Sequence, residues 1–195
     1  MADFKIRLIK NYWPFIKDEI YYPSYIRLHD HIDSLASLFI ENKINWIDAH
    51  LSASEWYYNQ GNIVQFLNEM DALIYRYPDV IEYPNYVAEK LQALQKYDQM
   101  YEYLLKCYSI NPNAYSTKWL GNINIYKGDI QTGRTFLNES LKFNKRDSQV
   151  LYNLALTYYN HDKNRALEYL DKALEVDPNY KRAIDLRKKL ITGMK

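Results

Sequence analysis

The sequence predicts an all-α chain of antiparallel helix pairs, and three observations support that prediction. The 195 residues include only 5 glycines and 6 prolines, fewer turn residues than a strand-rich chain of this length usually needs. Apolar side chains recur at the spacing of amphipathic helices. A proline turn also recurs, because Pro112 follows Pro78 by 34 residues and Pro178 follows Pro112 by 66, or two units of 33.

The composition narrows the function classes. Hydrophobic residues make up 48% of the chain and charged residues 25%, which is typical of a globular protein. The formal net charge of +1 argues against a general nucleic-acid or membrane-surface binder, since both need a basic excess. Tyrosine is unusually frequent, with 21 residues, and its ring can pack while its hydroxyl stays wet.

The sequence shows no targeting signal. No run approaches the roughly 20 apolar residues of a membrane-spanning helix. The first residues lack the apolar stretch of a secretory signal, and the single cysteine, Cys107, cannot form an internal disulfide. We therefore expect a cytoplasmic protein.

Residues 1–46 are expected to form an N-terminal helical segment that acts as a cap or a linker. Within it, residues 3–20 are predicted to be helical with a kink or break at Pro14. Residues 24–41 carry an apolar stripe that follows Ser24, a candidate N-cap.

Four units of two helical runs follow, and the last is the clearest. A polar break at residues 160–164 separates its two runs. The apolar positions of the first run are Val150, Leu151, Leu154, Ala155 and Tyr158, and those of the second are Ala166, Leu167, Leu170, Ala173 and Leu174. The other units span residues 47–80, 81–114 and 114–147, and Lys145 stands where the third unit would carry its proline.

Stacking explains why such units recur. One helix pair buries only part of its apolar face, whereas three or more stacked pairs build a continuous core. The small residues Ala88, Gly121, Ala155 and Ala173 would let helix backbones approach closely. Cys107 occupies a similar small-residue position, so we expect a buried packing thiol and not a nucleophile.

The last unit resembles the tetratricopeptide repeat in Leu151-Tyr152-Asn153-Leu154-Ala155, Tyr158, Ala166, Leu170, Ala173 and Asp177-Pro178-Asn179. The resemblance extends over about residues 47–192. It departs at Asn124, where Tyr or Leu is expected, and in the first unit, where Phe66 and Leu73 replace small residues. The resemblance implies a right-handed α-solenoid, a superhelix of antiparallel helix pairs. Residues 47–195 would form three to four repeats and a C-terminal capping helix.

Catalytic and metal-binding patterns are weak. His29 and His31 would point to opposite sides of a helix, and His50 and His161 stand alone. No His-x-x-x-His pair or cysteine pair occurs, and neither a Walker motif nor Gly-x-Gly-x-x-Gly is present. We therefore expect no enzyme activity, no metal and no cofactor.

The resemblance implies a concave groove lined by the first helix of each repeat. The groove residues carried over by repeat position, which we call the predicted groove set, are Lys118, Asn122, Tyr126, Tyr152, Asn153, Leu156, Tyr159 and Arg182. Tyrosine offers contact area at low entropic cost, and an asparagine amide can bond the peptide backbone as donor and acceptor. A protein or peptide is therefore the expected partner.

Some members of the family grip a C-terminal carboxylate with a Lys–Asn pair, a further Asn and two basic residues. Lys118, Asn122, Asn153 and Arg182 match four of these positions. Leu186 stands at the fifth. The alternative is a polar groove of other specificity.

These features favour a non-catalytic scaffold or adaptor that binds a protein segment in its concave groove. One alternative is a regulatory or substrate-recruiting domain of a larger enzyme. Another is a self-associating module, a possible homo-oligomer. Residues 179–195 hold six Lys or Arg against one Asp. They are expected to form a solvating capping helix, with contact to an acidic partner or nucleic acid as the alternative.

Overall fold

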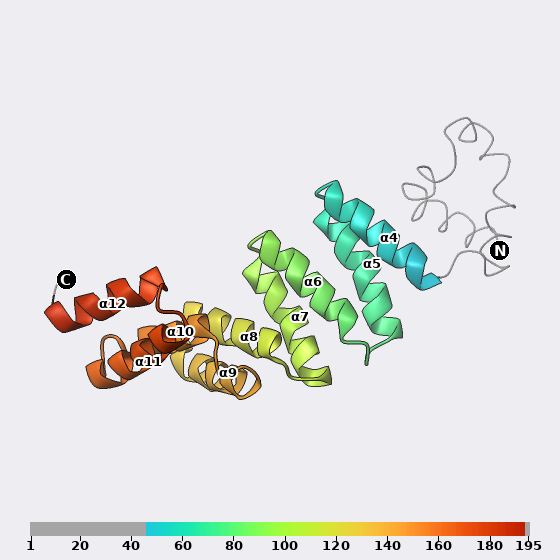
Figure 1. The fold of residues 1–195 in the computed structure, drawn as a ribbon. Helices are drawn as coiled ribbons and strands as arrows, with labels where there is room; N and C mark the ends of the chain where they lie inside the picture. Colours follow the sequence, from blue (N-terminus) through green and yellow to red (C-terminus); the bar gives the residue numbers. More distant parts are fainter. Residues whose placement is uncertain (1–45, 194–195) are drawn as a thin grey trace, which may run out of the picture. The chain divides into compact units, whose positions relative to one another are not determined.

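The computed structural model describes residues 46–193, and this part of the chain consists of helices joined by short turns and contains no strand (Figure 1). The helices are α4 (Trp46–Asn59), α5 (Ile63–Arg76), α6 (Glu82–Ala93), α7 (Tyr97–Ile110), α8 (Ala114–Tyr126), α9 (Ile130–Phe143), α10 (Ser148–Tyr158), α11 (Lys163–Val176) and α12 (Lys181–Thr192). The predicted all-α helical repeat is confirmed. The helices expected at 3–20 and 24–41, with His29 and His31, lie outside the described residues.

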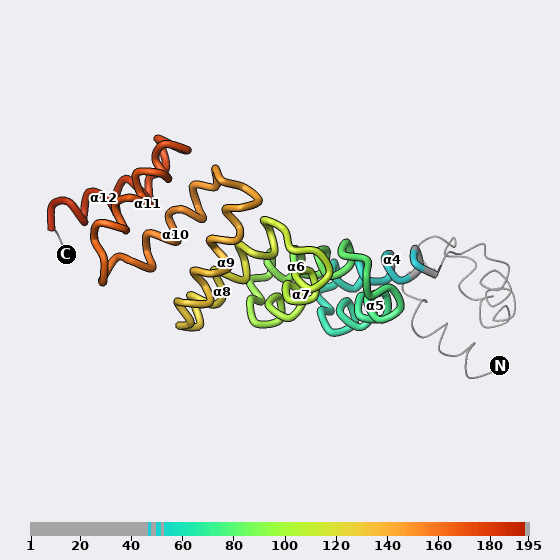
Figure 2. The backbone as a smooth tube through the Cα atoms, turned by 90° about the horizontal axis from the view of Figure 1, so that it is seen from below, coloured from blue at the N-terminus to red at the C-terminus, as the bar shows by residue number. Residues whose placement is uncertain are grey.

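Each predicted unit forms one helix pair, and Figure 2 traces the pairs from α4 to α12. The proline turns explain where the pairs end. Pro78, Pro112 and Pro178 each stand two residues beyond the last residue of α5, α7 and α11. Lys145 stands two residues beyond α9 in the same way, so the third unit keeps the turn without its proline.

Polar N-caps start most of the helices. The side chains of Asn62, Asn113, Asp129, Asp147 and Asp162 each accept a backbone N–H of the first turn of the following helix. Such caps satisfy donors that have no partner inside the helix, and each contributes about 1 kcal/mol. The short turns between the helices are therefore well defined by local sequence.

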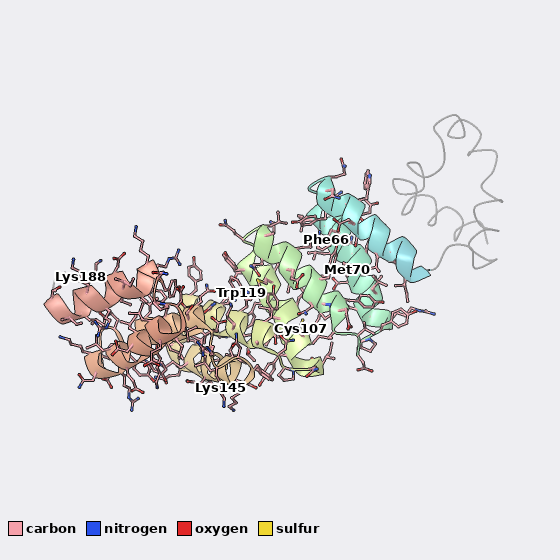
Figure 3. The ribbon with its side chains drawn as sticks, in the orientation of Figure 1. Phe66, Met70, Cys107, Trp119, Lys145 and Lys188 are labelled. Atoms are coloured by element: carbon pink, nitrogen blue, oxygen red, sulfur yellow. The ribbon has the colours of Figure 1, made fainter. Side chains whose placement is uncertain are left out.

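The chain divides into two compact units, residues 1–83 and 84–195. In the first unit α4 packs against α5. Phe66, Met70 and Leu73 of α5 are fully buried there, and Figure 3 labels the first two. Phe66 and Leu73 are thus core residues of the pair, although the repeat resemblance predicts small residues at their positions.

The second unit begins at Pro84 within α6 and extends through α12, and its core is built on leucines and small residues. Leu120, Leu137, Leu154 and Leu170 are fully buried. At Gly121 of α8 an added Cβ would stand 2.7 Å from the Leu137 side chain and 3.0 Å from the carbonyl oxygen of Gly133. The predicted close approach of helix backbones is therefore present between α8 and α9.

Two unusual residues of the second unit are accommodated in the core. Asn124 is buried, and its Nδ2 donates to the carbonyl oxygen of Leu120 at 2.8 Å, so the amide has a partner at a position where Tyr or Leu is expected. Cys107, labelled in Figure 3, is fully buried with its Sγ 3.4 Å from Asn85 Oδ1. Burial raises the pKa of the Cys107 thiol to about 12, so the expected packing thiol is confirmed.

None of the described helices is long and apolar enough to cross a membrane. The same residues contain no group of three or more His, Cys, Asp or Glu that could hold a metal ion.

Candidate functional site

The predicted groove set lies on three helices of the second unit. Lys118, Asn122 and Tyr126 belong to α8, and Arg182 belongs to α12. The other members stand on α10 or at its C-cap: Tyr152, Asn153, Leu156 and Tyr159. Because α8 and α10 are the first helices of consecutive pairs, their side chains can meet across one repeat.

An amide pair joins the two first helices. Asn153 Nδ2 donates to Asn122 Oδ1 at 2.7 Å, and both side chains are partly buried. An asparagine amide has two donor hydrogens and a carbonyl that accepts two bonds. The pair therefore keeps donors and acceptor capacity beyond its mutual hydrogen bond, held in one place by two helices.

Lys118 is engaged by the start of α10. Its Nζ lies 3.2 Å from Asp147 Oδ2, and the two side chains are only 23% and 17% exposed. The other carboxylate oxygen of Asp147 accepts the backbone N–H groups of Gln149 and Val150, each at 3.0 Å. Asp147 is thus both the N-cap of α10 and the anion that neutralises Lys118.

Tyr152 connects α10 to the residue that precedes α12. Its ring lies 5.4 Å from the ring of Tyr180 at 67°, an edge-to-face contact. Burial raises the pKa of the Tyr180 hydroxyl, and the charge of Arg182 partly opposes that shift. Arg182 therefore lies close to the Tyr152–Tyr180 contact, whereas Arg187 pairs with Asp171 of α11, its Nε donating to Oδ1 at 2.6 Å.

Tyr126 stands beside an apolar hollow of about 210 Å³. Tyr97, Trp119, Asn122, Ile123 and Tyr126 line this hollow, which we call the aromatic hollow. The rings of Tyr97 and Trp119 stack at 5.9 Å and 18°, while Tyr126 is 86% exposed. Figure 3 labels Trp119. The aromatic hollow thus adjoins the amide of Asn122.

Repeat position alone did not place Tyr97 and Trp119 at the site. Tyr97 opens a second helix, and Trp119 precedes the core residue Leu120. The groove pattern covers only the first helices, so a contact with the start of α7 falls outside it. The sequence feature that could have pointed to them is their aromatic character.

Leu156 lines a separate hollow at the end of α10. In that hollow the guanidinium of Arg134 donates to the hydroxyl and the carbonyl oxygen of Thr157, and lies 3.9 Å from the centre of the Tyr158 ring. Arg134 therefore donates to one carbonyl oxygen near the helix C-terminus, where a cation is stabilised by the helix dipole. Tyr159 is partly buried at the C-cap of α10.

The first unit contains a buried polar contact that the sequence did not reveal. His50 Nδ1 lies 2.6 Å from Glu69 Oε2, with the two residues 7% and 5% exposed. They stand 19 residues apart on α4 and α5, so no local motif joins them. The isolated histidine of the sequence is therefore part of a helix–helix contact.

Comparison with known proteins agrees with the repeat pattern. The tetratricopeptide repeat matches residues 91–114 and 148–180. No curated protein sequence matches the chain. A crystal structure of MamA is 16% identical with a TM-score of 0.65, covering 75% of this chain and 87% of that one.

Two further solved structures share the fold. A tetratricopeptide repeat protein from Parabacteroides merdae is 16% identical with a TM-score of 0.65, covering 77% of this chain and 62% of its own. YrrB, described as a protein of this repeat type with an unusual peptide-binding site, is 17% identical with a TM-score of 0.61. That match covers 94% of this chain and 97% of YrrB.

Proposed function

We propose that this chain, in which the tetratricopeptide repeat matches residues 91–114 and 148–180, is a non-catalytic adaptor that binds an extended segment of another protein along α8 and α10. The observation that carries the proposal is the hydrogen bond of 2.7 Å between Asn122 and Asn153. It holds two amide groups in a fixed position on the first helices of neighbouring repeats.

An extended peptide presents a donor and an acceptor at every residue, and the amide pair offers both kinds of partner. Beside it the aromatic hollow offers an apolar surface for one side chain of the bound segment. Aromatic anchors of this kind supply much of the energy of an interface. The unusual peptide-binding site of YrrB, a protein of the same fold, adds support for a ligand of this class.

We propose that the main chain is gripped and that a terminal carboxylate is not required. Lys118 already pairs with Asp147 at 3.2 Å, so a carboxylate would have to compete with the N-cap of α10. Leu186 stands at the fifth position of the carboxylate-binding pattern, and Arg187 is directed to Asp171. An internal segment of a partner protein fits these contacts better than a chain end.

Selection of peptides from a random library on the full chain, followed by calorimetry, tests this function. Asn122→Ala and Tyr126→Ala are each expected to weaken binding about tenfold or more, as loss of a hot-spot contact does. Tyr75→Ala is the matched control, because Tyr75 is 90% exposed on α5 and lies in the first unit. Equal affinities of the groove variants and the control would contradict the proposal.

Amidation of the peptide C-terminus separates the two groove hypotheses. We expect the selected peptides to keep their affinity when amidated or extended, because the amides of Asn122 and Asn153 would hold the backbone. A loss on amidation that Lys118→Ala and Arg182→Ala reproduce would instead establish a carboxylate clamp.

A further inference from the structure

The terminal helix α12 stands at the start of a fifth unit. Its N-cap, Tyr180, follows the N-cap of α10, Asp147, by 33 residues. By this offset four residues of α10 correspond to residues of α12: Leu151 to Ile184, Leu154 to Arg187, Ala155 to Lys188 and Tyr158 to Ile191. In α10, Leu151, Ala155 and Tyr158 pack in one cluster with residues of the second helix of the pair, α11, whereas Leu154 packs with Leu137 of α9.

The same face of α12 has no second helix among the described residues. Leu151 is 4% exposed in α10, whereas the matching Ile184 is 43% exposed and Ile191 is 53% exposed. Gly193, at φ 65°, ends α12 in the left-handed conformation. The opposite side of α12 is buried, since Ala183 and Leu190 join the core with α10 and α11. The expected purely solvating cap therefore carries an exposed apolar face.

A hollow of about 250 Å³ marks this face between α11 and α12. The residues that line it, which we call the terminal face, are Leu174, Ile184, Arg187, Lys188, Ile191 and Thr192. Figure 3 labels Lys188 on α12. The terminal face thus combines isoleucine side chains with two cations, a pattern that differs from the leucines of the internal pairs.

The position of Lys188 defines what the terminal face can accept. In the four preceding first helices the matching residues are small and buried: Ser54, Ala88, Gly121 and Ala155. Against Gly121 the second helix places Leu137. A lysine at this position can cover apolar surface with its stem, and its ammonium favours a polar or anionic partner within reach.

Charge on the terminal face is only partly neutralised within the chain. Arg187 pairs with Asp171 at 2.6 Å. No carboxylate of the described residues pairs with Lys188, which is exposed. An incoming carboxylate would therefore meet an available cation flanked by Ile184 and Ile191.

We propose that the terminal face docks an amphipathic helix of a partner protein that carries an acidic side chain between apolar ones. The incoming helix takes the place of the second helix of the fifth unit. Its apolar side chains cover Ile184, Ile191 and Leu174, and its carboxylate pairs with Lys188. This surface is distinct from the groove of α8 and α10, so the two proposals stand or fall separately.

A labelled peptide with the sequence of α11 provides the probe, because α11 packs on the matching face of α10. Leu170 of α11 corresponds to Leu137 by the offset of 33 residues between the N-caps Asp129 and Asp162. One probe carries Leu170→Glu and its matched control carries Leu170→Lys. In fluorescence anisotropy with the full chain, the Glu peptide is expected to bind at least about tenfold more tightly than the Lys peptide. The reason is that the lysine of the control peptide would repel Lys188.

Charge exchange on the protein completes the test. Lys188→Glu is expected to reverse the order, so that the Lys peptide becomes the tighter ligand. Ile184→Ser together with Ile191→Ser should weaken the Glu peptide severalfold, and circular dichroism would verify that the helices remain. Equal affinities for both peptides, or no reversal in Lys188→Glu, would overturn the proposal.

Two other results would also overturn it. Loss of peptide binding in Asn122→Ala but not in Lys188→Glu would place the probe in the groove. A doubled mass of the free chain in light scattering, abolished by Lys188→Glu, would identify a second copy as the occupant.

Discussion

The helix pairs α4–α5 and α8–α9 differ in the size of the side chains that fill their interfaces. In α4–α5 the second helix contributes Phe66 and Leu73, both fully buried. The residues that match these by N-cap offset in α9 are Gly133 and Ser140. The first pair fills its interface with large side chains, whereas α8–α9 brings backbones together. A helix pair can therefore keep its order and turns while its interface changes from bulk to close approach.

Truncation of the bulky interface should have the largest effect. Phe66→Ala removes a fully buried aromatic ring and leaves a cavity, which is expected to lower the free energy of unfolding by about 3–5 kcal/mol. Urea denaturation followed by circular dichroism measures it, and Phe66→Leu should lose much less. A loss below about 1 kcal/mol would show that α4 and α5 close up as α8 and α9 do.

The second largest loss of stability is expected when a larger side chain replaces Gly121, where α8 and α9 approach closely. Gly121→Leu places atoms where even a Cβ stands 2.7 Å from Leu137, so we expect a loss of about 1–3 kcal/mol in the free energy of unfolding. Gly121→Ala should lie between the variant and the wild type in the same denaturation experiment. Unchanged stability of Gly121→Leu would mean that backbone proximity is not required in this pair.

A smaller loss of stability is expected when the N-cap of α10, Asp147, is replaced. The replacement also affects the groove, because Asp147 is the partner of Lys118. Asp147→Ala removes two hydrogen bonds to backbone N–H groups and the partner of Lys118, and should lower the free energy of unfolding by about 0.5–2 kcal/mol. Asp147→Asn keeps the cap and loses only the ion pair, so it should destabilise less. Equal losses in thermal denaturation would assign the effect to the ion pair.

The smallest expected effect on stability concerns Cys107 of α7, which is fully buried. Its thiol pKa is raised from 9.0 to about 12 by burial, so the folded state disfavours the thiolate. This contribution to stability is complete below pH 9 and is lost as pH rises toward 12. At a mildly alkaline pH of about 8 we expect slow labelling by iodoacetamide when folded and rapid labelling in urea. Rapid labelling of the folded chain would contradict a packed thiol.

Local pattern accounts for the parts of the fold that the sequence could predict. Pro78, Pro112 and Pro178 stop the second helices because proline cannot continue a helix, and the 33- or 34-residue spacing repeats that stop. Gly121 marks a close approach because even a Cβ there would stand 2.7 Å from the Leu137 side chain, and Ala155 is a fully buried small residue at the matching position of α10. The same pattern predicted the position of α12 but not its exposed isoleucines, because solvation of a terminal helix was expected from the architecture alone.

The candidate site was predictable only helix by helix. Repeat position placed Asn122 on α8 and Asn153 on α10, but their hydrogen bond joins residues 31 apart. The neutralisation of Lys118 by Asp147 also depends on how α8 meets the start of α10. A single sequence carries no information about such pairings, since each residue type is compatible with many partners.

The sequence by itself determined the helix pairs, their turns and the positions of their small residues, because these follow from local chain geometry and periodic burial. Only the tertiary structure decided which polar groups are already satisfied. It pairs His50 with Glu69 and Lys118 with Asp147, and it stacks Tyr97 on Trp119. Each of these contacts joins side chains on two different helices. The distance between the two helices decides whether the contact forms, and that distance is set by how the helices pack.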